Sequence, residues 1–349
     1  MKKTNCLLAG FLLIFICCFS DASKASGNKN TSIPTSVIFD TDMGNDIDDA
    51  LALDMLYKYM DMGRINLLGI MINKDYRYSP EFIDMMATWY GYPDVPIGVL
   101  KHGDSLRTDD MNYTKKVSDL QINGRPAFQR TIKDYESLPK ANKLYRKLLS
   151  EQPDGSVTII SVGFLTNLAQ LLDTPADEYS PLTGRELIAS KVKLLSVMAG
   201  SFSKEPYAEY NILIDKISAV KVFAEWPSSV VVSPFELGNA IQYPGASIEN
   251  DFKWTVKHPM VEGYKAFATM PYDRPTWDLT AVLYVAKPDS TFFKKSSPGT
   301  ITVDTEGYTH FVESKNGLHT YLSITPEQGM SILNYFTHLI TEQPRKYKY

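Results

Sequence analysis

Short, continuously apolar runs recur along the chain, and each is followed by a stretch with the apolar periodicity of a helix. The runs that we interpret as strands are residues 36–39, 67–72, 157–162, 194–198 and 230–233. The helix-like stretches between them are residues 49–60, 79–90, 141–151, 167–172 and 216–226. Apolar runs without polar alternation are typical of strands that are covered on both faces, as in a parallel sheet. We therefore predict an α/β fold with a mostly parallel central sheet and helices on both faces.

Two regions of the chain depart from this alternation of strands and helices. Residues 299–304, 310–315 and 318–324 are predicted to be antiparallel strands, with a turn at Asn316-Gly317 before the last one. Residues 103–135 are polar and contain Gly103, Gly124 and Pro126, which predicts a long loop. Long loops that persist in compact domains are often functional, so we interpret this segment as a lid.

The N-terminus is typical of an export signal. Lys2 and Lys3 precede an apolar stretch over residues 7–19, which a polar segment follows. Such a stretch is too short to span a bilayer as a helix but suits a signal peptide. We predict a signal peptide over residues 1–25, a flexible leader over 26–36 and one domain over 37–349. A retained short anchor is an alternative, and a lipoprotein signal ending at Cys17 or Cys18 is another.

The composition narrows the chemistry of the mature chain. All three cysteines, Cys6, Cys17 and Cys18, precede the predicted cleavage site. Disulfides and a thiol nucleophile are thereby excluded, and a metal site would use oxygen or histidine ligands. The net charge of -4 argues against a nucleic-acid partner. No later segment is apolar and long enough to cross a membrane, so we expect a periplasmic or secreted protein.

An unusual density of negative charge follows the first predicted strand, where five aspartates lie close together: Asp40, Asp42, Asp46, Asp48 and Asp49. The last two suit the first turn of a helix, which explains only part of the cluster. Crowded carboxylates raise one another's pKa unless a cation is present. A hard divalent cation resolves the conflict, and ligands of open α/β sheets bind beyond the carboxyl ends of strands.

Two other motifs fit this segment poorly. A calcium loop of the EF-hand type beginning at Asp40 would need glycine and glutamate where Asn45 and Leu51 stand. A phosphatase-type pair at Asp40 and Asp42 would bring a phosphate substrate against too much negative charge.

The segment Asp40-Thr-Asp42-Met-Gly44-Asn-Asp46-Ile-Asp48-Asp49-Ala50 resembles the fingerprint of the calcium-dependent nucleoside hydrolases, the inosine-uridine preferring nucleoside hydrolase superfamily. It carries two extra residues between the glycine and the paired aspartates, which leaves the role of Asp46 open. Three later segments resemble further motifs of this family in the same order: Val162-Gly163-Phe164-Leu165-Thr166-Asn167, Ala208-Glu209-Tyr210-Asn211 and Trp277-Asp278. The resemblance covers most of residues 37–349 and implies a fold of the nucleoside-hydrolase type.

The resemblance also implies a reaction, the hydrolysis of the N-glycosidic bond of ribonucleosides to free base and ribose. It implies that a calcium-bound water attacks the sugar and that Asp42 accepts the proton of this water. The implied calcium ligands are Asp42, Asp49, the backbone carbonyl of Val162, and Asp278. By the same resemblance, Asp48 and Asn211 bind the 2′ and 3′ hydroxyls of ribose, and Glu209 binds the 5′ hydroxyl. A homodimer or homotetramer is implied by the family alone.

Each of these residues also has a structural interpretation. Asp278 and Thr166 can cap helices, Asp40 can hold the backbone at the strand end, and Glu209 can be a polar loop residue. Four motifs in one order favour the functional interpretation.

Trp277 bears on the substrate, because many members of the family have a histidine acid at this position. None of the five histidines of this chain lies in a matched motif. A tryptophan here resembles the purine-preferring branch, in which it stacks on the base. Base stacking contributes about 1–3 kcal/mol. Candidates for a second stacking ring are Tyr113, Tyr207 and Tyr272, and the alternative for Trp277 itself is core packing beside Pro275.

We therefore predict an exported calcium-dependent ribonucleoside hydrolase, with purine substrates slightly favoured. One alternative is a hydrolase of pyrimidine nucleosides or other ribosyl compounds on the same scaffold. A second alternative is a catalytically silent exported protein that binds nucleosides or ribose.

Overall fold

The computed structural model describes residues 1, 33–101, 112–205 and 207–348 of the chain. The predicted signal peptide over 1–25 and most of the predicted leader over 26–36 lie outside the described residues. The chain divides into Met1–Ser32 and Ile33–Tyr349, and only the second unit is considered below. Its first strand begins at Thr35, so the last two residues assigned to the leader belong to the sheet.

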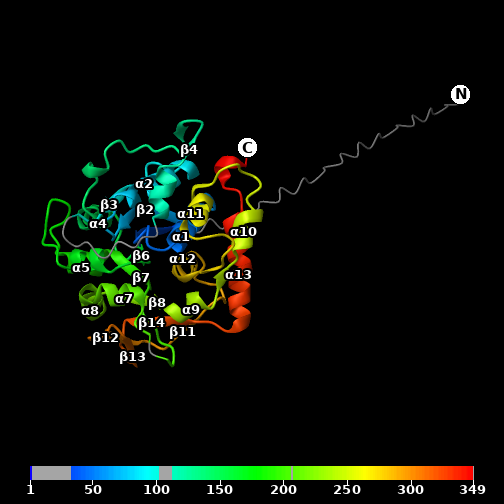
Figure 1. Cartoon of the computed structure of the whole chain (residues 1–349). Coiled ribbons are helices and arrows are strands. Elements are labelled where there is room, and N and C mark those ends of the chain that lie inside the picture. The colour runs from blue at the N-terminus through cyan, green and yellow to red at the C-terminus, as the bar shows by residue number, and fades with distance from the viewer. Residues whose placement is uncertain (2–32, 102–111, 206, 349) are drawn as a thin grey trace. The chain divides into compact units, whose positions relative to one another are not determined.

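Seven strands of the central sheet pair in parallel. They are β1 (Thr35–Thr41), β2 (Ile65–Ile72), β3 (Ile97–Val99), β6 (Val157–Ser161), β7 (Val192–Met198), β8 (Ser229–Ser233) and β14 (His319–Ser323). Three antiparallel strands complete it: β11 (Lys294–Lys295), β12 (Gly299–Val303) and β13 (Thr309–Glu313). The order is β13-β12-β14-β8-β7-β6-β1-β2-β3, with β11 paired to β14 (Figure 1). The predicted mostly parallel sheet is confirmed.

Successive residues of the central strands pack into two different cores. Val37 and Phe39 of β1 contribute to one core, and Ile38 between them contributes to the other. The first core contains side chains of α1 (Asp48–Asp61), α2 (Tyr78–Tyr90), α11 (Pro259–Phe267), α12 (Trp277–Ala286) and α13 (Pro326–Thr341). The second contains those of α4 (Ala141–Ser150), α5 (Thr166–Leu172), α6 (Gly184–Lys191) and α8 (Lys216–Glu225). Burial on both faces explains the continuous apolar runs and confirms the prediction of helices on both sides.

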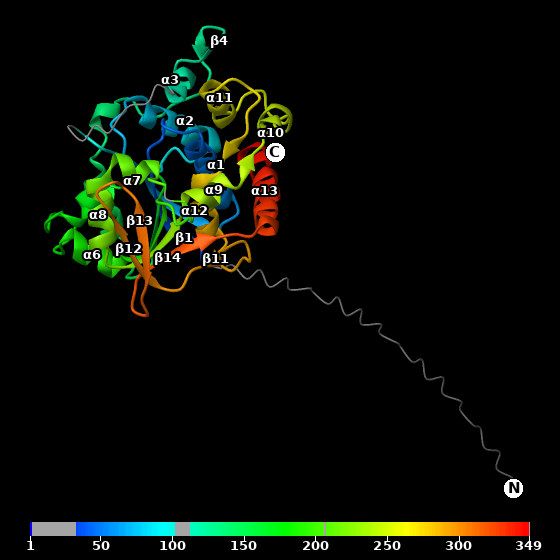
Figure 2. The same cartoon turned by 60° about the horizontal axis from the view of Figure 1, so that its bottom comes forward.

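The prediction that residues 103–135 form a loop is wrong for residues 112–135, the described part of this segment. This part contains α3 (Tyr113–Ser118) and a hairpin of β4 (Gln121–Ile122) and β5 (Arg125–Pro126), which projects from the molecule (Figure 2). Tyr113 and Val117 are one helical turn apart and buried, so they anchor α3 in the first core. Residues 102–111 lie outside the described residues, and the lid stays a prediction.

The predicted strands near the C-terminus are confirmed, and β12 lies between β13 and β14. Short elements complete the unit: η1 (Tyr135–Ser137), α7 (Tyr210–Ile214), α9 (Phe235–Asn239), β9 (Gln242–Tyr243), α10 (Gly245–Asn250), β10 (Arg274–Pro275) and η2 (Arg345–Tyr347). Within the described ranges, no helix combines the length and the apolar character that a bilayer crossing requires.

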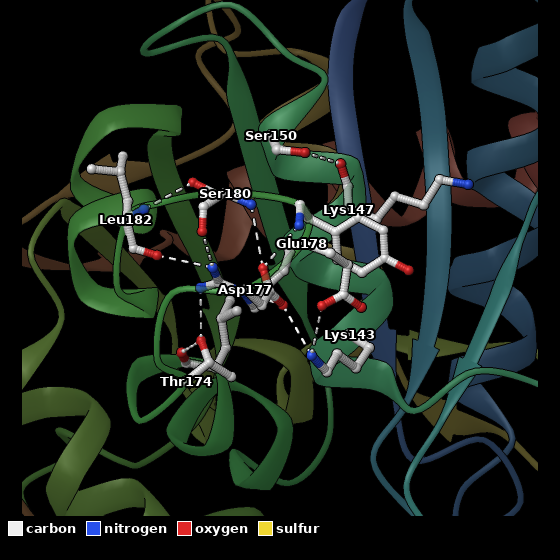
Figure 3. A network of polar contacts seen from close by, with 11 residues as sticks. Lys143, Lys147, Ser150, Thr174, Asp177, Glu178, Ser180 and Leu182 are labelled. Carbon is white, nitrogen blue, oxygen red and sulfur yellow. Dashed lines mark hydrogen bonds and ion pairs between the residues drawn. The ribbon is translucent and has the colours of Figure 1, made fainter.

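A buried arginine of α4, Arg146, ties the connection between α5 and α6 to this helix. Figure 3 shows Asp177 of this connection and its contact with Lys143 of α4. The Nε of Arg146 lies 2.8 Å from a carboxylate oxygen of Asp177. The other guanidinium nitrogens of Arg146 donate to the Thr174 hydroxyl and to the carbonyls of Ser180 and Leu182, at 2.9 to 3.0 Å. The guanidinium holds the pKa of Asp177 well below its usual range. This network fixes a connection that has no sheet partner.

Candidate active site

A cavity of about 270 Å³ opens at the carboxyl ends of β1, β6 and β7. All eight residues that the sequence analysis assigned to the site line it: Asp42, Asp48, Asp49, Val162, Glu209, Asn211, Trp277 and Asp278. The parallel topology brings the end of β1 beside the end of β6, where Asp40 pairs with Ser161. Loops after neighbouring parallel strands therefore converge on one site.

Three of these carboxylates form a compact buried group. Oxygens of Asp48, Asp49 and Asp278 all lie within 4.8 Å of one another, and each side chain is buried. Asp48 and Asp49 occupy the first turn of α1, and Asp278 occupies the first turn of α12. Burial, and then the negative charges of the neighbours, raise the pKa of Asp278 well above its ordinary value. This arrangement of oxygen donors is a suitable site for a hard divalent cation.

Asp42 lies in the same cavity but outside this three-carboxylate group. The Asn45 amide donates to its Oδ2, and the Lys74 ammonium donates to the Asn45 side-chain carbonyl. Burial raises the pKa of Asp42 to about 6, against the opposing effects of the Asn45 hydrogen bond and the Lys74 charge. The Lys74 ammonium and the Asn45 amide thus stabilise the ionised form of the Asp42 carboxylate.

Asp40 is fully buried and does not line the cavity. Its carboxylate accepts hydrogen bonds from Tyr145 at 2.6 Å, Asn73 at 2.5 Å and Asn167 at 3.2 Å. Burial raises the pKa of Asp40 to about 7, although the three hydrogen bonds oppose this. Asp40 therefore ties the end of β1 to α4, to α5 and to the segment after β2.

The approach of β6 to β1 requires a glycine. A Cβ added to Gly163 would lie 2.6 Å from the Asp42 nitrogen and 2.7 Å from the Asn73 Oδ1. The Asn73 Oδ1 accepts a hydrogen bond from the Phe164 nitrogen at 3.1 Å, and the Asp40 carbonyl accepts one from the Val162 nitrogen at 2.8 Å. These contacts place the Val162–Gly163 segment against Asp42.

Glu209 and Asn211 lie at the start of α7, and both line the cavity. The Glu209 carboxylate caps this helix by accepting from the nitrogens of Asn211 at 2.9 Å and Ile212 at 3.3 Å. It also accepts from the Gly200 nitrogen at 3.0 Å, which joins the loop to the end of β7. Burial raises the pKa of Glu209 to about 7.

One wall of the cavity is a stack of three aromatic rings. Trp277 stacks on Phe235 with ring centroids 5.4 Å apart, and Phe235 stacks on Tyr207 at 4.2 Å. The Trp277 Nε1 donates to the Phe235 carbonyl at 3.0 Å. Of the three tyrosines considered as second stacking rings, only Tyr207 lines the cavity. Tyr113 is buried in the first core, and Tyr272 stacks on Tyr264.

The sequence analysis missed an ion pair in the cavity wall. The Arg274 Nε donates to Asp46 Oδ1 at 2.9 Å, and its Nη2 donates to Asp46 Oδ2. Phe235 and Phe267, which also line the cavity, were missed as well. The available signal was Asp46, whose charge had no assigned role in the sequence motifs.

The fold and this cavity define a class of α/β enzymes that bind a small ligand over acidic residues at the carboxyl ends of parallel strands. The family model described as inosine-uridine preferring nucleoside hydrolase matches residues 37–336, and the chain belongs to this family. It is therefore a nucleoside N-ribohydrolase, which decides against the silent binding protein. A search of curated proteins finds no match.

Solved structures share the fold over nearly their whole length. A plant nucleoside hydrolase is 19% identical, with 89% of this chain and 100% of that chain covered and a TM-score of 0.65. A purine-preferring ribonucleoside hydrolase from Gardnerella vaginalis is 15% identical, with 88% and 98% covered and a TM-score of 0.66. An inosine-uridine preferring nucleoside hydrolase from Bacillus anthracis is 19% identical, with 88% and 99% covered and a TM-score of 0.61. These likenesses confirm the predicted fold type.

Proposed function

We propose that this nucleoside hydrolase binds calcium, favours purine ribonucleosides and uses Asp42 to activate the attacking water. The observation that carries the proposal is the group of buried carboxylates beside Asp42, in a cavity with an aromatic wall.

Calcium suits the donor set of this cavity. Three buried carboxylates within 4.8 Å repel one another, and a cation would remove the cost of ionising them together. Every candidate donor is an oxygen, including the proposed carbonyl of Val162, and calcium prefers oxygen ligands in high coordination numbers. We assign the ion to Asp42, Asp49, Val162 and Asp278. Asp48 belongs to the same carboxylate group, and we assign it to the sugar. When bound, the ion would orient the sugar diol and lower the pKa of a water.

The residues around the ion would hold the sugar. Asp48 and Asn211 would bind the 2′ and 3′ hydroxyls. The Asp48 carboxylate would accept hydrogen bonds from them, and the Asn211 amide can donate and accept. Glu209 accepts three backbone N–H groups, and an ionised carboxylate has about four acceptor positions, so it retains capacity for the 5′ hydroxyl. Fixing the ring in this way supplies catalysis through orientation.

Asp42 is the group that we assign as general base. Asn45 occupies one of its carboxylate oxygens, and the other can accept the proton of the attacking water. Burial raises the pKa of Asp42 to about 6 without the ion, and a bound calcium ion would lower it, so Asp42 would be ionised at neutral pH and able to accept a proton.

The stack of Tyr207, Phe235 and Trp277 is the support for a purine base. A bicyclic purine offers more π surface to this wall than a pyrimidine does. The name of the Gardnerella vaginalis enzyme, which states a purine preference, agrees with this assignment. A pyrimidine or other ribosyl substrate remains the alternative that kinetics decides. We also propose that residues 1–25 direct export of the protein. The mature protein would then be periplasmic, secreted or lipid-anchored, and it would form a homo-oligomer.

Replacing Asp42 by asparagine tests the assignment of the base. We expect Asp42→Asn to lower kcat for inosine by about 10²–10⁴-fold, because general-base catalysis contributes on this order. Inosine affinity, measured by calorimetry at a calcium concentration that saturates the variant, should change much less. The matched control is Asp75→Asn, which removes the same charge from an exposed residue outside the cavity. Equal turnover of the two variants would contradict the role of Asp42.

A further inference from the structure

The ion pair of Asp46 and Arg274 is a feature that the proposed function leaves unexplained. Asp46 belongs to the loop between β1 and α1, and Arg274 belongs to β10, more than two hundred residues later. Their side chains are 26% and 27% exposed, so the pair lies at the cavity wall rather than in the core. Two N–H groups of the guanidinium point to the two oxygens of one carboxylate, which fixes its orientation.

Arg274 is held against the aromatic side of the cavity. Its Cζ lies 5.3 Å from the ring centroid of Trp277 and 5.0 Å from that of Phe267. Trp277 directly precedes Asp278 in α12, so the aromatic wall adjoins the acidic group. A base that stacks on this wall while its ribose lies over the carboxylates would meet the guanidinium.

The chemistry of the reaction favours a positive group or a proton donor at this position. When the C1′–N bond breaks, its electron pair leaves with the base nitrogen, and the base becomes an anion unless it is protonated. Among the described residues that line the cavity there is no histidine and no lysine, and Arg274 is the one cationic side chain. His258, the most buried of the described histidines, contacts Trp89, Tyr90 and Trp254 and does not line the cavity.

We propose that Arg274 is a catalytic residue that donates hydrogen bonds to the departing base and stabilises its negative charge, and that Asp46 is its positioning residue. This inference rests on the proposed function. A guanidinium does not give up its proton near neutral pH, so Arg274 acts as a fixed hydrogen-bond donor and not as a general acid. Asp46 takes two of the five N–H groups and leaves the others for the base.

The step balances without a further reagent. The oxygen of water bonds to C1′ and its proton passes to Asp42, while the electron pair of the C1′–N bond moves to the base. The base anion then takes up one proton from the solvent, and Asp42 returns its proton to the solvent. Nucleoside and water thus give ribose and neutral base.

The test compares two ribosides whose leaving groups need very different amounts of stabilisation, inosine and 4-nitrophenyl β-D-ribofuranoside. The nitrophenolate leaves without such help. We expect Arg274→Gln to lower kcat/KM for inosine by about 10²–10³-fold, as for the loss of one preorganised donor. The loss for the nitrophenyl riboside should be less than about tenfold. Arg274→Lys should restore part of the inosine activity, because it restores the charge. Asp46→Asn should show the same selective loss at a smaller size.

Arg185→Gln is the matched control, because Arg185 is exposed on α6 and outside the cavity lining. Thermal unfolding of each variant shows that it is folded. Equal losses on both substrates, or an unchanged rate on inosine, would overturn the role of Arg274. No turnover of either substrate by the unmodified enzyme would instead overturn the proposed function itself.

Discussion

Single residues at the end of β1 carry two different tasks. Asp40 faces into the protein and holds three neighbouring segments, whereas Asp42, two residues later, faces the cavity. The two carboxylates thus differ in their partners and not in their burial. A fully buried carboxylate with three donors is a structural anchor, because removing it would leave those donors unpaired.

Gly163 is the residue whose substitution tests this local packing. We expect Gly163→Ala to destabilise the protein by about 1–3 kcal/mol, because the new Cβ would lie 2.6 Å from the Asp42 nitrogen. The displacement of Asp42 should also lower kcat for inosine. Urea unfolding and ribose release measure the two effects. Gly329→Ala in α13 is the control, since its Cβ would meet only ordinary contacts; a loss of similar size there would contradict the packing argument.

At the scale of residues, the motifs predicted eight of the sixteen cavity-lining positions, because each of the eight lies within a short local pattern. They could not predict Arg274, Phe235 or Phe267, because these meet the motif residues only through the fold. Asp46 and Arg274 are 228 positions apart, and no spacing rule connects them.

Among the elements, the loop between β1 and α1 is the most specialised. It is two residues longer than the shortest form of the fingerprint, and side chains from its enlarged part are engaged with the cavity. Asn45 contacts Asp42 and Lys74, and Asp46 pairs with Arg274. Within the loop, Gly44 has a φ of 110°, which favours glycine and turns the chain after Asp42. The longer loop thus adds groups that would orient Asp42, the proposed general base, and Arg274, the proposed leaving-group donor.

The connection between α5 and α6 gives a testable prediction at this scale. We expect Arg146→Ala to destabilise the protein by about 3–5 kcal/mol, because it would leave Asp177 and two carbonyls without their buried partner. Urea unfolding measures the effect. Lys143→Ala, which removes a half-exposed partner of the same Asp177, should cost less than about 1 kcal/mol. Similar losses for the two variants would show that the buried network does not stabilise this connection.

The elements of the central sheet were predictable because their strands are buried on both faces and therefore continuously apolar. Helix α3 and the β4–β5 hairpin were not, because their sequence is polar and only Tyr113 and Val117 reach the core. Tertiary packing, rather than composition, decides such segments.

For the whole molecule, the buried carboxylates link stability to pH and to metal. The pKa values of Asp42, Asp40 and Glu209 rise to about 6, 7 and 7 on folding. A raised carboxyl pKa means that the folded state binds protons more tightly than the unfolded chain. The contribution of these three carboxyl groups to the free energy of unfolding is therefore present at acidic pH, and it is lost as the pH rises towards their pKa values in the folded protein.

Calcium should reverse this loss. The ion needs ionised ligands, so at a fixed calcium concentration its stabilising effect should grow with pH. At a free calcium concentration one hundred times Kd, the stabilisation is about 2.7 kcal/mol. We expect the calcium-induced rise in Tm to be larger at about pH 8 than at about pH 5. Calorimetry of the chelator-treated protein, with and without added calcium, measures it. The same rise at both pH values would argue against a metal at the carboxylate group.

The most direct measurement of the central claim is ribose release from inosine and from uridine by residues 26–349, first with calcium and then with excess chelator. The account predicts release that the chelator abolishes, calcium restores, and inosine supports faster than uridine. Release that persists in excess chelator would contradict the metal site, and release from uridine at an equal or higher rate would contradict the purine assignment.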